Sequence, residues 1–135
     1  MAQAKIADRE GYRAVTASIA AGDDHPAVPR EVLATAVRYL LQRLAQQATG
    51  NTVEVRIPPF GAIQCVEGPG HTRGTPSNVV EMDAVTWIAL ATGSLSWAAG
   101  IESGRIHASG QRADLSAYLP LNLLRAEEPE VSENS

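Results

Sequence analysis

Three glycines divide residues 83–121 into short segments, and this spacing restricts the folds that the chain can adopt. Gly93, Gly104 and Gly110 stand between runs of apolar or alternating residues. Glycine enters the left-handed backbone region without strain, so the chain can reverse its direction at these points. The segments between the glycines predict a helix, a second helix, a strand and a third helix. This mixture indicates an α+β domain.

The first of these segments is apolar on nearly every side of a helix. Asp83 precedes it and can cap its N-terminus, because an aspartate side chain accepts hydrogen bonds from the free amides of a first turn. A helix of this kind is buried, or it lines an apolar space. Its apolar residues are Ala84, Val85, Trp87, Ile88, Ala89, Leu90 and Ala91.

The rest of this stretch predicts one strand and one helix. Residues 105–109 alternate and are expected to form a short strand. The last helix is expected from Gln111 onward, because Leu115, Tyr118 and Leu119 follow one another at the spacing i, i+3 and i+4. Both elements would help to cover or extend a sheet.

The segment of residues 29–48 predicts the longest helix. Pro29 suits a first helical position, and Gly50 stands just beyond the end. The apolar residues form one stripe, which must lie on a flat apolar surface, most simply a sheet. The stripe consists of Leu33, Ala36, Val37, Leu40, Leu41, Leu44 and Ala48.

Three strands are expected to follow this helix, because apolar and polar residues alternate with a period of two. They cover residues 52–57, 62–67 and 77–82. A loop with three glycines and two prolines, residues 68–76, separates the last two. With the strand at residues 105–109, the sheet is expected to contain four strands.

The two ends of the chain are set apart from the expected domain of residues 29–125. Residues 1–28 are expected to form an arm or a short helix, and both a helix over residues 8–21 and a partly ordered arm fit the pattern. Residues 126–135 form an acidic tail with almost no apolar content, which predicts disorder. The chain therefore predicts one domain with two extensions.

Charge and composition restrict the partners and the compartment. The net charge of -4, with the eleven basic residues scattered along the chain, argues against nucleic-acid binding. No window approaches the ~20 apolar residues of a membrane span, and no signal peptide is expected. The single cysteine, Cys65, excludes an internal disulfide and fits a reducing compartment. We therefore expect a cytoplasmic protein without stable membrane insertion, and a homodimer remains open.

Three side chains are candidates for reactive or binding groups. Cys65 lies within an expected strand, where a small buried thiol is the usual explanation and a nucleophile is the alternative. His71 and Arg73 lie in the glycine-rich loop and can capture a carboxylate or phosphate headgroup, or bond to the loop itself. The histidines lack metal-ligand spacing, so no metal, cofactor or catalytic constellation is expected.

Trp87 and Trp97 fall on the two helices that are expected to cover the sheet. Most buried tryptophans belong to a core. Two large side chains on adjacent helices can also wall a cavity, since ligand pockets combine apolar walls with a few polar groups. The sequence leaves both interpretations open.

The run IPPFGAIQCVEGPGHTRGTPSNVVEMD resembles the small stand-alone bacterial members of the sterol carrier protein (nonspecific lipid-transfer) family. The resemblance covers residues 30–121, in the order helix, three-strand meander, helices, strand, helix. It implies a mostly antiparallel sheet of four to five strands covered by helices, with an apolar tunnel between the layers. The wall of that tunnel would consist of Trp87, Leu90, Trp97, Ile101, Leu115, Tyr118 and Leu119.

Three functions of different classes follow. The first is non-enzymatic binding or carriage of a lipid or another hydrophobic small molecule. The second is an accessory domain in thiol metabolism, since a similar domain occurs, more distantly, in mycothiol-dependent maleylpyruvate isomerases. The third is a protein-interaction module without a ligand. Fold alone does not choose among them.

Overall fold

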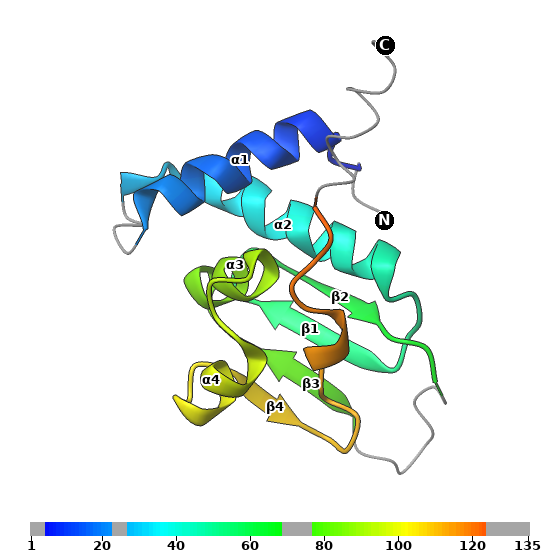
Figure 1. Cartoon of the computed structure of the whole chain (residues 1–135). Coiled ribbons are helices and arrows are strands. Elements are labelled where there is room, and N and C mark those ends of the chain that lie inside the picture. Colours follow the sequence, from blue (N-terminus) through cyan, green and yellow to red (C-terminus); the bar gives the residue numbers. More distant parts are fainter. Residues whose placement is uncertain (1–4, 23–26, 69–76, 124–135) are drawn as a thin grey trace.

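Figure 1 shows the computed structural model of the whole chain. The residues that it describes are 5–22, 27–68 and 77–123. The acidic tail expected at residues 126–135 lies outside them. The α+β class is confirmed, and the strands begin and end within two residues of the expected ranges. In chain order the elements are α1 (Asp8–Ala21), α2 (Arg30–Gln47), β1 (Val53–Ile57), β2 (Gly61–Cys65), β3 (Asn78–Glu81), α3 (Ala84–Thr92), α4 (Trp97–Glu102), β4 (His107–Ser109) and the 3-10 turn η2 (Ser116–Tyr118).

The four strands pair in the order β2-β1-β3-β4. Strand β1 is antiparallel to β2 and parallel to β3, and β4 is antiparallel to β3. The sheet is therefore mostly antiparallel, as expected, but the expected three-strand meander is wrong, because β3 pairs with β1 and not with β2. An alternating pattern indicates which face of a strand is buried. It does not indicate which strand lies beside it, because the pattern would be the same with β1 or with β2 as the neighbour. A parallel pair also needs a long connection, which β2 and the following loop supply.

The sheet has one apolar face and one polar face. On the apolar face, Val53, Val55 and Ile57 of β1 are fully buried. On the polar face, the guanidinium of Arg56 lies 3.1 Å from the Glu54 carboxylate and 3.9 Å from that of Glu81. These ion pairs are solvent-exposed, so they contribute little to stability. The stability of the fold must come from the other face.

Helix α2 covers the apolar face, with β2 as its main contact in the sheet (Figure 1). All seven residues of its expected apolar stripe are buried, which confirms the interpretation of residues 29–48. Leu40, Leu41 and Leu44 are at most 1% exposed. Burial of such side chains contributes about 1.5–3 kcal/mol each before entropy costs. Helix α2 is therefore the main helix that covers the apolar face of the sheet.

Helix α1 lies along α2 and forms a second helical layer (Figure 1), so the helix expected over its residues is confirmed. Tyr39 on the back of α2 is fully buried, because Gly11 of α1 lies directly against its ring. The Tyr39 hydroxyl donates to Asp8 at 2.9 Å. Burial, together with this bond, raises the pKa of Tyr39 to about 12. The side-chain amide of Gln42 also accepts from the Ile6 amide and donates to the Ile6 carbonyl, each at 2.9 Å.

The helix expected from Gln111 is wrong, because this segment contains only the single turn η2. The Asp114 carboxylate accepts from the Ser116 amide at 2.8 Å, and this local bond competes with a helix. The same bond lowers the pKa of Asp114. Beyond the turn, the Leu121 amide donates to the Ala91 carbonyl at 2.9 Å, which ties the segment to α3. The spacing of Leu115, Tyr118 and Leu119 therefore arises from an irregular segment that packs on the core, and not from a helix.

Replacing Leu40 by alanine should lower the free energy of unfolding by ~2–5 kcal/mol, because the change leaves a cavity beneath α2. Gln46→Ala, at an exposed position of the same helix, is the control and should cost under ~0.5 kcal/mol. Denaturant unfolding measures both. A loss at Leu40 no larger than at Gln46 would remove α2 from the core.

Gly11→Ala should destabilise the protein, although alanine is the better helix former by ~1 kcal/mol. A Cβ at this position would overlap the Tyr39 ring, and overpacking usually costs ~1–3 kcal/mol. Ala17→Gly, at an exposed site of α1, measures helix propensity alone. Thermal unfolding compares the variants, and a gain in stability for Gly11→Ala would show that α1 does not pack on Tyr39.

Candidate functional site

A pocket of about 260 Å³ lies within the helical layers, between the end of α1, the start of α2 and one face of α3. Helix α3 contributes a stripe spaced i, i+3, i+4 and i+7, which is one side of a helix. The stripe consists of Val85, Ile88, Ala89 and Thr92. The other described lining residues are Ser18, Ile19 and Gly22 from α1 and its end, Leu33 from α2, Ser94 and Leu95 after α3, and Arg105 before β4.

The opposite side of α3 faces the protein core. Trp87 and Leu90 on that side are at most 1% exposed, and Ala91 is fully buried. A helix with apolar residues on nearly every side was expected to be buried or to line an apolar space, and α3 does both. Its two faces therefore serve different purposes: one fixes the helix to the core, and the other lines the pocket.

Most polar side chains of the pocket are bonded within the protein. The Ser18 hydroxyl donates to the Ala14 carbonyl at 2.9 Å, and the Thr92 hydroxyl donates to the Ile88 carbonyl at 2.6 Å. Arg105 is bonded as well, through its Nε to the Thr86 hydroxyl at 3.1 Å, and it is the one charged side chain among the described lining residues. The pocket is therefore apolar along α3, with a single cation on its border.

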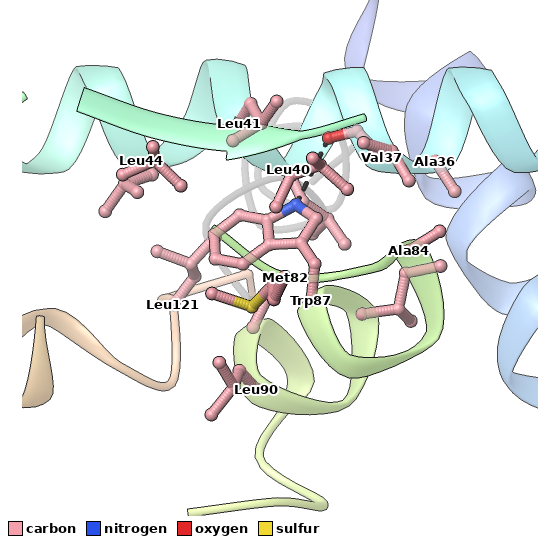
Figure 2. Packing of buried hydrophobic residues seen from close by; sticks show 14 of the residues in the cluster. Ala36, Val37, Leu40, Leu41, Leu44, Met82, Ala84, Trp87, Leu90 and Leu121 are labelled. Atoms are coloured by element: carbon pink, nitrogen blue, oxygen red, sulfur yellow. Dashed lines mark hydrogen bonds between the residues drawn. The ribbon is translucent and has the colours of Figure 1, made fainter. Parts of the chain in front are cut away.

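Trp87 belongs to the core. Its indole lies beneath α2, near Leu40, Met82 and Leu121 (Figure 2), and it is fully buried. The indole Nε1 donates to the Val37 carbonyl at 3.3 Å, so its one polar atom has a partner inside the protein. The structure thus favours the core interpretation of this tryptophan.

The remaining residues of the expected tunnel wall divide between the core and its border. Leu90 and Leu115 are buried, whereas Trp97, Tyr118 and Leu119 are partly buried and pack against the same hydrophobic cluster. Ile101 on α4 is 40% exposed. None of the seven described wall residues lines the pocket. His71 and Arg73, the expected headgroup ligands, lie outside the described residues.

The pocket residues Val85, Ile88, Ala89 and Arg105 were missed as a group by sequence reasoning. A signal existed, because the stripe on α3 has helical spacing and stands apart from the side that carries Trp87. The large tryptophan side chains directed attention to the other side of the helix. Arg105 follows Gly104 in a glycine-bounded turn, and its approach to α3 depends on tertiary structure.

Cys65 and His107 offer little chemistry. The Cys65 thiol is fully buried, as expected for a structural cysteine, and burial raises its pKa to about 11. A neutral thiol is a poor nucleophile. His107 is exposed on β4, beside a broad recess of about 530 Å³ that also borders Arg56 and Glu81 on the polar face of the sheet.

In the described residues, no group of three or more histidine, cysteine, aspartate or glutamate side chains lies close enough to hold a metal ion. Within the same ranges, no helix has the length and apolar character to cross a bilayer.

Comparison with known proteins identifies a family. A family model described as "Bacterial SCP ortholog" matches residues 29–121, which is more than half of the chain. The matched region runs from the residue before α2 to the end of the segment that is tied to α3. It leaves out α1, which nevertheless borders the pocket. No curated protein shows a significant match to the chain.

The Cys65 thiol should react slowly with iodoacetamide in the native protein and rapidly in denaturant, because the reactive thiolate is suppressed by burial. Its folded pKa lies above the ordinary value of about 8.5. The stability contributed by the protonated thiol is therefore complete below pH ~8.5 and falls as the pH rises toward 11. Cys65→Ala is the labelling control, and rapid native alkylation at pH 7 would contradict a buried thiol.

Proposed function

The chain belongs to the bacterial SCP ortholog family, a group of sterol-carrier-like proteins, and from this premise we propose that it binds a lipid or another hydrophobic small molecule without converting it. The proposed site is the pocket between α1, α2 and α3. The observation that carries the proposal is the second apolar face of α3, which faces this pocket.

The size of the pocket supports a small apolar ligand or part of a larger one. Its volume of about 260 Å³ exceeds that of an engineered ~150 Å³ apolar cavity that binds benzene. It falls below the ~300–1,000 Å³ of sites that enclose a drug-sized ligand. An alkyl chain or a single ring fits this space, whereas a large polycyclic ligand would remain mostly outside.

An estimate of the binding energy follows from the hydrophobic effect. Each buried methylene contributes ~0.8 kcal/mol, so about six of them contribute ~5 kcal/mol before ordering costs. For a simple alkyl probe the dissociation constant is therefore expected to be no tighter than about 0.1–1 mM. Additional polar contacts would strengthen the binding of a natural ligand.

The wall expected from the family resemblance is a less favourable place for the ligand. Trp87, Leu90 and Leu115 already pack against protein atoms, so a ligand there would have to displace them. Close packing of this kind resists insertion of extra groups. The pocket on the other side of α3 requires no such displacement.

Binding without catalysis also agrees with the composition of the pocket. Its described lining residues include no histidine, cysteine or carboxylate that could act as a nucleophile or base. The alternative role in thiol metabolism has less support, because the Cys65 thiol is buried and its pKa is raised to about 11.

Octan-1-ol should bind saturably, and the amide chemical shifts of residues 85–95 should follow the titration. Ala89→Phe should abolish this response, because the new ring fills the pocket. Ala98→Phe is the matched control, since Ala98 is exposed on α4 and does not line the pocket. Loss of binding with Ala98→Phe and not with Ala89→Phe would move the site to the side of Trp97, and no saturable response in the parent protein would overturn the proposal.

A further inference from the structure

We infer that Arg105 recognises the head of the ligand, so that the pocket selects a single-chain amphiphile with an anionic terminal group. The inference rests on the proposed function and adds the chemical class of the ligand. Carboxylates and phosphates both match the planar fork of a guanidinium, and either can serve as the head.

In the described parts of the chain, the guanidinium of Arg105 is held on one side only. Its Nε donates to the Thr86 hydroxyl at 3.1 Å, and Thr86 is 1% exposed in the first turn of α3. That turn is itself fixed, because the Asp83 carboxylate accepts from the Thr86 amide at 2.9 Å. The anchor leaves the two terminal nitrogens of the guanidinium, with four N–H donors, to face other groups.

The positive charge of Arg105 suits an anion at this point. Arg105 forms no ion pair with a carboxylate in the described parts of the chain, where the acidic partners Glu54 and Glu81 belong to Arg56 on the polar face of the sheet. The other described residues of the pocket are uncharged. An anionic head beside Arg105 would therefore meet a cation without a competing carboxylate among the described lining residues.

The arrangement of polar and apolar groups matches an amphiphile in one orientation. Arg105 is exposed to solvent, so a bound head remains partly hydrated there. The stripe that begins with Val85 and Ile88 then provides an apolar path along α3. The volume of about 260 Å³ exceeds the ~150 Å³ of an apolar cavity that binds benzene, so the pocket accommodates a short alkyl chain.

The test compares three probes that share an octyl or octanoyl chain: octanoate, monooctyl phosphate and octan-1-ol. Arg105→Gln should weaken the two anions about fivefold to tenfold, because it removes a charge-assisted but solvent-exposed contact. It should change the affinity for octan-1-ol by less than about twofold. Arg13→Gln removes the same charge from an exposed position of α1 outside the pocket, and it should leave all three affinities unchanged.

Each outcome has a defined meaning. Weakening of only one anion would support the inference and identify the head as a carboxylate or as a phosphate. Equal weakening of octan-1-ol would overturn it, because Arg105 would then support the structure of the pocket and not the head. Unchanged anion affinities would overturn it as well. If octan-1-ol itself fails to bind the parent protein, the proposed function fails, and that result is distinct from a failure of headgroup recognition.

Discussion

The burial of the Trp87 indole beneath α2 is the constraint on which the rest of the site depends. Its hydrogen bond to the Val37 carbonyl and its packing among Leu40 and Met82 fix the rotation of α3 about its own axis (Figure 2). Successive residues of a helix are about 100° apart, so this rotation directs Val85, Ala89 and Thr92 to the side opposite Trp87. Ile88 belongs to the hydrophobic cluster and also lines the pocket. The position of the pocket is thus a consequence of how Trp87 packs in the core.

Two further contacts hold α3 in place at its ends. Asp83 caps the first turn, and the Leu121 amide binds the Ala91 carbonyl near the last turn. Helix α1 then closes the pocket from the other side, through its position on Tyr39 of α2. Because the matched family region begins only at residue 29, the contribution of α1 to the pocket is a feature that the family match alone does not describe.

Sequence periodicity predicted the elements well and their arrangement poorly. The stripe of α2 and the alternation of Val53, Val55 and Ile57 follow directly from which side of each element is buried. The parallel pairing of β3 with β1 could not be predicted in this way, since alternation does not identify a neighbour. At the site, the sequence correctly marked α3 as apolar on all sides, but which side faces the pocket depends on where Trp87 packs. The approach of Arg105 to Thr86 joins residues 19 positions apart and has no local sequence signal.

The central claim is that the outward face of α3 receives the hydrocarbon part of a ligand. Intermolecular nuclear Overhauser effects between an unlabelled octyl chain and the labelled methyl groups of the protein test it most directly. The account predicts contacts from the chain to the methyl groups of Val85, Ile88 and Leu95, which line the pocket. Contacts to Leu90 and Leu115 in the core, with none to the pocket methyl groups, would contradict it.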